Sequence, residues 1–387
     1  HKVVYKSDRL KIFYKIAKEI IRKNAAYVCE CGASELRENR ADGIACEHRE
    51  QDIEINVKKW MAMLKGKYKE GEATVRLKTD IQHPNPAFRD RVMLRVATRK
   101  HPRVGKKYKV WPMLEFSWAV DDHLLGITHI LRGKDLVIED MVEEFIWNLM
   151  GWKRAEILHY GLLNLEGVKL SKTESRKMVG KKIYKGWDDP RIWSLQSLEK
   201  RGIQPQAIRN FIIGMGMSLA DVMVPVEILY AENRKLIDKN ANRYFCVTNP
   251  VTISVKGADV KVVKAHMHPD FPKRGYRKIP VDVNKMYIEK NDFEKLHDTE
   301  VGLMNLFSVK LNKISEPTSK EVKYEIQKIH WVSEPNVKIK IVMPDGKEIG
   351  ALAESSVKKV KKGEIVQFPR IGFARLDKNM TFYFAHK

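Results

Sequence analysis

Apolar side chains recur at helical spacing in the first 150 residues. Residues 10–21 place six of them on one face, with Ser7 as a candidate N-cap, so we predict a helix that ends near Asn24. Residues 55–64 and 137–149 show the same spacing, and a glycine follows the latter closely. Three amphipathic helices are therefore predicted here.

Strand-like runs lie between these helices, at residues 73–77 and 91–96. Residues 187–240 are again helical in pattern, and Pro190 and Pro205 suit first turns of helices, where a missing N–H costs nothing. The pattern therefore mixes helices and strands over the first 240 residues.

Beyond residue 250 the hydrophobic period changes from helical to two, which is typical of strands. The Pro344-Asp345-Gly346 sequence predicts a hairpin turn. Many short strands in a small region predict one or two small antiparallel β-barrels. The clearest runs are 251–255, 260–263, 286–288 and 337–342.

The chain of 387 residues carries a net charge of +23, spread along its length and not gathered in a tail. Such a surface suits an extended polyanion, although a generally basic surface is the alternative. No apolar run is long enough for a membrane span or a signal peptide. Four cysteines make no disulfide framework, so we expect a cytoplasmic protein without membrane contact.

Three of the cysteines form a candidate metal site. Cys29 and Cys31 are two residues apart, and Cys46 and His48 repeat that spacing. Thiolates and imidazole are the ligands that structural Zn²⁺ prefers, and four of them leave no open position for catalysis. The alternative is separate buried cysteines and a surface histidine; Cys246, within an apolar run, is predicted to be a core residue.

A short basic stretch, Lys169-Leu170-Ser171-Lys172-Thr173, carries the most informative candidate chemistry. It resembles the KMSKS loop of class I aminoacyl-tRNA synthetases, and this resemblance implies that a loop cation such as Lys172 stabilises the negative charge that grows on the leaving pyrophosphate when an ATP α-phosphate is attacked. A solvated basic loop is the alternative interpretation.

Taken together, several motifs in order resemble the glutamyl-tRNA synthetases of the archaeal and eukaryotic type, class I aminoacyl-tRNA synthetases close to the glutaminyl enzymes. The 169–173 stretch looks like their KMSKS loop. The other motifs are Asp121–His129, Leu163–Glu166, Gly186–Arg191 and Ile329–Ser333. The adjacent residues Asp121 and Asp122 could bind magnesium. Because neighbouring side chains do not share a face, we favour a structural or capping role for them.

The resemblance implies a partial Rossmann-like α/β catalytic domain with an acceptor-binding insertion that holds the zinc site. A helical stem-contact region and two anticodon-binding β-barrels follow. The expected ranges are 1–24 for the end of the first Rossmann half, 25–115 for the insertion, 116–180 for the second half, 181–240 for the stem-contact region and 241–387 for the barrels.

The implied reaction joins glutamate to tRNA(Glu) through glutamyl-adenylate, with Mg²⁺-ATP as substrate. Lys172, with Ser171 and Lys169, would stabilise the pyrophosphate, and backbone groups at Leu163 and Leu170 would hold adenine. We expect a monomer, and charging of tRNA(Gln) stays open.

Arg132 stands where the glutamyl enzymes keep an arginine facing the substrate γ-carboxylate. A guanidinium bonds both oxygens of a carboxylate but is left partly unpaired against an amide. Leu114 occupies the place where relatives usually have a tyrosine that lines the amino-acid pocket. A surface arginine is the alternative interpretation of Arg132.

In the barrel region, Arg274, Tyr276 and Arg277 lie in a segment that looks like the anticodon contact of the glutaminyl relatives. Unstacked loop bases are bound by aromatic stacking and hydrogen bonds, which suits a tyrosine beside arginines. A solvated basic loop is again the alternative.

The HIGH motif of the family does not occur in the sequence. We therefore expect that residues 1–387 alone bind tRNA but are incomplete for catalysis. A glutaminyl-tRNA synthetase and a non-catalytic tRNA-binding module remain the two alternatives to a glutamyl enzyme.

Overall fold

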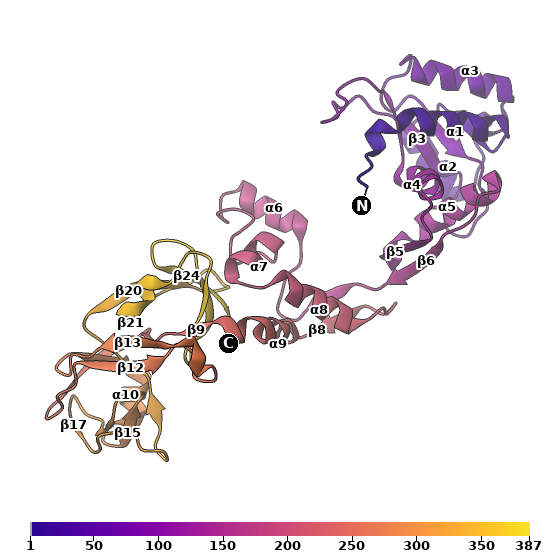
Figure 1. Ribbon diagram of the computed structural model, residues 1–387. Coiled ribbons are helices and arrows are strands. Elements are labelled where there is room, and N and C mark those ends of the chain that lie inside the picture. Colours follow the sequence, from indigo (N-terminus) through magenta and orange to yellow (C-terminus); the bar gives the residue numbers. More distant parts are fainter. Residues whose placement is uncertain (1) are drawn as a thin grey trace. The chain divides into compact units, whose positions relative to one another are not determined.

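The computed structural model describes residues 2–387 and divides into two compact units. Of the described residues, the first comprises 2–162 with 217–221, and the second 163–216 with 222–387. Figure 1 labels many of their helices and strands.

The first unit begins with a helix packed beside an antiparallel sheet of order β1-β2-β3-β4. Helix α1 buries Phe13 and Ile20 in a core that also contains Trp60 of α3. The predicted helices and strands in this part are confirmed. Their bounds are α1 Leu10–Arg22, β1 Ala26–Cys29, α2 Ala33–Asp42, α3 Ile53–Leu64, β2 Thr74–Leu77, β3 Val92–Val96 and β4 Val110–Pro112.

The predicted capping role of Ser7 is wrong. Ser7 is buried in a 3-10 turn, Lys6–Asp8, and Arg9 holds the N-cap position of α1 without a side-chain cap. The Ser7 hydroxyl faces the adjacent Asp8 carboxylate at 3.5 Å, so it does not serve the helix.

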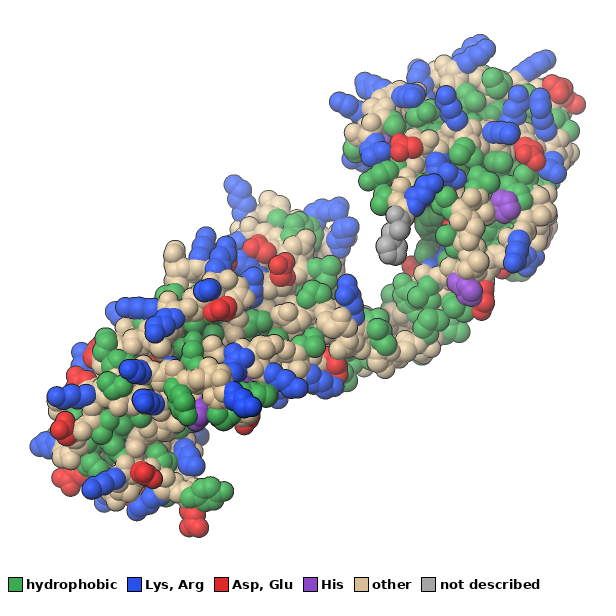
Figure 2. Space-filling view, viewed as in Figure 1, with side chains coloured by type: hydrophobic (Ala, Val, Ile, Leu, Met, Phe, Trp, Pro, Cys, Tyr) green, Lys and Arg blue, Asp and Glu red, His purple; other side chains and the backbone are tan. Residues whose placement is uncertain are grey.

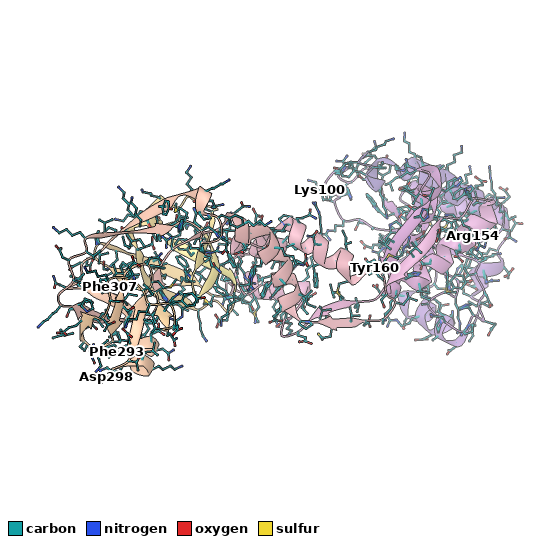
Figure 3. The ribbon with its side chains drawn as sticks, turned by 60° about the horizontal axis from the view of Figure 1, so that its bottom comes forward. Lys100, Arg154, Tyr160, Phe293, Asp298 and Phe307 are labelled. Atoms are coloured by element: carbon teal, nitrogen blue, oxygen red, sulfur yellow. The ribbon has the colours of Figure 1, made fainter. Side chains whose placement is uncertain are left out.

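A parallel β-α-β element completes the first unit. Strand β5 (His129–Gly133) pairs in parallel with β6 (Glu156–Tyr160), and α5 (Val137–Met150) connects them. Figure 3 labels Tyr160, the last residue of β6. As predicted, α5 stops at Gly151, whose φ of +66° favours glycine. Helix α4 (Leu114–Leu124) packs against α5.

The second unit opens with a short parallel pair, β7 (Leu163–Leu165) and β8 (Val222–Val224). Pro205 begins α8, as predicted. The same prediction for Pro190 is wrong: it lies in a turn, and the next helix, α7, starts only at Leu195 with Ser194 as cap. The helices here are α6 Lys172–Gly180, α7 Leu195–Arg201, α8 Pro205–Met215 and α9 Val226–Ile237.

Two curled seven-stranded sheets follow, of order β10-β21-β20-β24-β23-β22-β9 and β18-β15-β16-β17-β11-β14-β19. Phe307, labelled in Figure 3, is buried in the core of the second sheet. Cys246 is buried in the core of the first, as predicted. Their strands are β9 Asn242–Arg243, β10 Cys246–Val247, β11 Pro250–Val255, β14 Met286–Glu289, β15 Glu300–Leu303, β16 Ser308–Lys310, β17 Ile314–Pro317, β18 Lys328–Ile329, β19 Val332–Ser333, β20 Asn336–Val342, β21 Glu348–Glu354, β22 Ile365–Phe368, β23 Gly372–Leu376 and β24 Thr381–His386.

The expectation of antiparallel barrels needs correction, because both sheets are mixed. The predicted turn at 344–346 does join antiparallel β20 and β21, but β20 also pairs in parallel with β24. Strands β11 and β17 form another parallel pair. Connections that cross over other strands bring the chain back in the same direction, which a period-two pattern does not reveal. A separate antiparallel pair, β12 (Val262–His266) with β13 (Tyr276–Pro280), and helix α10 (Lys290–Leu296) lie in the same region.

Within residues 2–387, no helix combines the length and the apolar character needed to cross a bilayer.

Candidate functional site

The four predicted metal ligands meet at one point of the first unit. Cys29 ends β1 and Cys31 follows it, while Cys46 directly precedes the short 3-10 segment Glu47–Glu50 that contains His48. One ligand atom from each lies within 4.8 Å of the others. The Cys29 and Cys46 sulfurs are 3.8 Å apart, and Cys31 Sγ is 3.4 Å from His48 Nδ1. This set, the Cys/His cluster, has the donor chemistry and compactness to hold one metal ion.

Arg76 completes the surroundings of the Cys/His cluster, and sequence analysis missed it. Its side chain is buried, and Nη1 lies 3.8 Å from Cys29 Sγ and 3.7 Å from Cys46 Sγ. Hydrogen bonding from Cys29, then from Tyr27, and the positive charge of Arg76 lower the pKa of the Cys46 thiol to about 4. The sequence did place a charged residue between Val75 and Leu77 in a predicted strand, and this could have indicated a buried cation.

Arg132, the predicted glutamate contact, lies on β5 within a buried ion-pair network. Its Nη1 and Nη2 atoms donate to the two carboxylate oxygens of Glu143 at 2.6 and 3.3 Å. Nη1 is also 3.0 Å from Asp140 Oδ1, and the guanidinium lies 5.0 Å from the centre of the Trp118 ring. Leu114 is more than half exposed at the start of α4.

The two acidic partners of Arg132 were also missed. Asp140 and Glu143 stand three residues apart on α5, so both reach the same side of the helix. Burial raises the pKa of Glu143 to about 7, against the lowering effect of Arg132. The spacing of these two acidic residues in the helix after β5 could have identified them as partners of Arg132.

The 169–173 stretch, called here the ATP loop, is only partly a loop. Ser171 is the N-cap of α6 and accepts a hydrogen bond from the Glu174 amide at 3.3 Å. Lys169 Nζ pairs with Glu174 Oε2 at 2.6 Å. Lys172, exposed at the first position of α6, has no ion-pair partner among residues 2–387, so its charge faces solvent.

A cavity of about 450 Å³ lies beside the ATP loop, within the second unit. Its wall includes Lys169 and Ser171, together with Arg191, Tyr230 and the hairpin residue Asp345. Leu163 lies in β7, paired with Val222, and Leu170 is half exposed. The geometry thus offers cations and a cavity on one side of α6.

The predicted anticodon residues divide between surface and interior. Tyr276 is 59% exposed, whereas Arg277, the next residue of β13, is buried and donates to Glu354 Oε1 at 2.8 Å. Arg274 donates to the carbonyl oxygens of Lys239 and Asn240 at 2.9 and 2.8 Å. Tyr276 is therefore the member most open to a ligand.

Basic side chains are distributed over the visible surface of both units (Figure 2). This agrees with the net charge of +23 and with the absence of one dominant basic tail. Such a distribution favours contacts with a long polyanion at several places.

Three family models match the chain. The catalytic domain of class I tRNA synthetases (E and Q) matches residues 1–239. Two anticodon-binding domain models of the same group match residues 241–329 and 328–377.

Individual relatives cover almost the whole chain. Glutamate–tRNA ligase of Pyrococcus abyssi is 42% identical over 405 aligned residues, spanning 100% of this chain and 70% of that protein. The Methanocaldococcus jannaschii ligase is 40% identical over 97% of this chain and 69% of its own. A solved glutamate–tRNA synthetase from Elizabethkingia anophelis is 18% identical, with a TM-score of 0.37 over 60% of this chain and 54% of that one.

Proposed function

Because the chain belongs to the class I tRNA synthetases for glutamate and glutamine, we propose that it serves the ATP-dependent joining of glutamate to tRNA(Glu). The observation that carries the choice of glutamate is the identity of about 40% with glutamate–tRNA ligases across essentially the whole chain. A glutaminyl enzyme and a non-catalytic module have less support.

The first chemical step is attack of the glutamate α-carboxylate on the α-phosphate of ATP, which releases pyrophosphate. In this proposal Lys172 stabilises the charge that grows on the pyrophosphate, because its ammonium is exposed at the N-terminus of α6 and has no ion-pair partner among the described residues. The helix N-terminus adds a favourable field for anions. Ser171 then has a positioning role as the α6 cap, and Lys169 is tied to Glu174.

Mg²⁺ would accompany the ATP phosphates in this step. Backbone groups at Leu163 and Leu170 are the proposed adenine contacts, and the half-exposed Leu170 supports this. The second step transfers the glutamyl group to a terminal ribose hydroxyl of the tRNA.

The Arg132 guanidinium is the proposed contact for the γ-carboxylate of glutamate. A guanidinium has five N–H donors, and Glu143 takes only two of the hydrogen bonds. Donors remain for a substrate carboxylate, while an amide would satisfy them less well. Leu114 is proposed to line the same pocket, since it is exposed at the start of α4.

Zinc is the metal that best fits the Cys/His cluster, given three thiols and one imidazole within 4.8 Å. Zn²⁺ bound there would be structural, joining β1 to the segment that carries Cys46 and His48. Arg76 would offset the negative charge of three thiolates.

The tRNA contacts are assigned by region. Residues 25–115 are proposed to bind the acceptor end, 181–240 the stem and 241–387 the anticodon, where Tyr276 can stack on a base. In this role Arg274 and Arg277 first hold the fold, through backbone carbonyls and Glu354. We further propose a monomeric cytoplasmic protein, with tRNA(Gln) as a possible second substrate.

The proposal is tested by charging assays with the full-length protein. We expect glutamate-dependent pyrophosphate exchange and charging of tRNA(Glu), with glutamine as a poor substrate. A preference for glutamine over glutamate in kcat/KM would overturn the assignment.

A further inference from the structure

Arg132 is surrounded by more negative charge than it can neutralise. Besides Glu143 and Asp140, bonded as described above, Asp122 of α4 acts on the guanidinium through its charge. His159 of β6 pairs with Asp140. One arginine thus faces three carboxylates within one buried network.

The other charged groups nearby do not remove this imbalance. Arg9 is occupied by Asp121 at 2.5 Å. Lys6, in the turn before α1, lies 5.2 Å from the Trp118 ring centre, and its buried Nζ has no hydrogen-bond partner among residues 2–387. Burial lowers the pKa of Lys6, and even with Lys6 counted as a cation the three carboxylates of Glu143, Asp140 and Asp122 outnumber Arg132 and Lys6.

A substrate γ-carboxylate would add one more negative charge to this network. A charge buried without a partner is strongly unfavourable, so the network favours losing one negative charge as the substrate arrives. The simplest means is protonation of a carboxylate already bonded to Arg132.

We propose that Glu143 is a positioning residue whose carboxylate takes up one proton when Arg132 binds the γ-carboxylate of glutamate, so that glutamate binding is coupled to proton uptake. This inference rests on the proposed role of Arg132. The proton comes from bulk water. The resulting neutral carboxyl group keeps a carbonyl oxygen that still accepts a hydrogen bond from Arg132.

Glu143 is better suited to this role than its neighbours. Its side chain is fully buried, whereas Asp140 is shared with His159 and Asp122 has no hydrogen bond to Arg132 in the structure. Burial raises the pKa of Glu143 to about 7, where the cost of adding a proton near neutral pH is small. Burial also raises the pKa of Asp122, so that residue requires a control.

Proton coupling would make the choice of amino acid depend on pH. A γ-carboxylate binds best when Glu143 is neutral, and that state is lost as pH rises through the pKa of about 7. A glutamine amide adds no charge and gains nothing from the proton. Preference for glutamate should therefore decline above neutral pH.

The test is the pH dependence of the glutamate KM in the full-length protein. We expect the KM to rise by about tenfold between pH 6 and 8, the limit for one coupled proton with a pKa near 7, while the ATP KM changes little. Glu143→Gln should abolish this rise. His159→Gln and Asp122→Asn, which alter the neighbouring groups, should keep it.

Calorimetry of the wild-type protein gives an answer that does not depend on any variant folding. Glutamate binding at pH 7.5, measured with tRNA in buffers of different ionisation enthalpy, should take up roughly 0.7 proton. Uptake near zero, or an unchanged pH profile in a folded Glu143→Gln protein, would overturn the inference. If proton coupling is absent but Arg132→Ala still loses glutamate activity, only the inference about Glu143 fails. The proposed role of Arg132 as the γ-carboxylate contact then stands.

Discussion

The Cys/His cluster and the ATP loop carry the two kinds of chemistry that the sequence predicted, and they differ in burial. The cluster is buried, with its four ligand atoms together and Arg76 beside the sulfurs. The ATP loop presents Leu170 and Lys172 at the surface, and the hydrogen bond that makes Ser171 a helix cap is only partly buried.

This difference indicates different roles. A structural metal site gains from ligands that are held in place before the ion binds, and from a buried cation that offsets thiolate charge. A group that acts on ATP phosphates must keep its charge available to a ligand. Lys172, at the first position of α6 and without an ion-pair partner in the described part of the chain, meets that condition, whereas Lys169 is already paired with Glu174.

Removal of a ligand from the Cys/His cluster should have the largest effect. We expect Cys46→Ser to lose the zinc and to unfold the region around β1–β4 at lower temperature, because structural zinc can supply ~10 kcal/mol or more of apparent binding free energy. Elemental analysis and thermal unfolding measure this. Cys246→Ala is the matched control, because it removes a buried thiol that lies in another core. Full-length wild-type protein that folds normally without zinc would contradict the structural role.

Arg132→Cys tests the proposed role of the buried cation Arg132 in the choice of substrate. We expect the glutamate kcat/KM to fall by a factor equivalent to about 3–5 kcal/mol of lost transition-state stabilisation, because the γ-carboxylate loses its proposed cation and Glu143 and Asp140 are left without theirs. Glutamine kcat/KM should fall much less, and thermal unfolding of the variant separates specificity from stability. A glutamate kcat/KM within a few-fold of wild type would exclude Arg132 as the specificity residue.

Lys172→Ala tests the exposed side of the comparison. We expect the rate of pyrophosphate exchange to fall by about 10²–10³-fold, as for loss of one group that stabilises transition-state charge, with little change in stability. Lys177→Ala is the control, since Lys177 is an exposed lysine on the same helix. Equal losses in both variants would mean that general positive charge matters, not the position of Lys172.

The sequence predicted local features better than partnerships. The helix at 137–150 and its stop at Gly151 follow from the spacing of apolar residues and one glycine. The meeting of the four metal ligands follows from two closely spaced pairs. The partnership of Arg76 with Cys29 joins residues 47 positions apart, which no local pattern encodes.

The same limit explains the sheets and the anticodon residues. Period-two alternation located strands β11, β14 and β20, but the parallel pairing of β20 with β24 depends on how distant segments meet. On β13, the burial of Ile279 fixes which face is inside, and Arg277 lies on that face because it is two residues away. That alternation was available in the sequence, although the ion pair with Glu354 was not.

Tyr276 is exposed and the next residue, Arg277, is buried, so one strand shows the same contrast between an exposed and a buried site. Of the substitutions considered, Tyr276→Ala should have the smallest effect. We expect tRNA(Glu) affinity to fall by about 1–3 kcal/mol, the usual contribution of one base stacked on an aromatic ring, with an unchanged melting temperature. The slope of affinity against salt should stay the same, because no charge is removed. Tyr324→Ala, which removes a 90% exposed tyrosine elsewhere in the same unit, is the control for binding titrations. If both variants bind tRNA as tightly as wild type, Tyr276 is a surface residue without an anticodon role. Because Arg277 is buried beside Tyr276, the contacts with the anticodon bases would then have to come from other strands of the curled sheets.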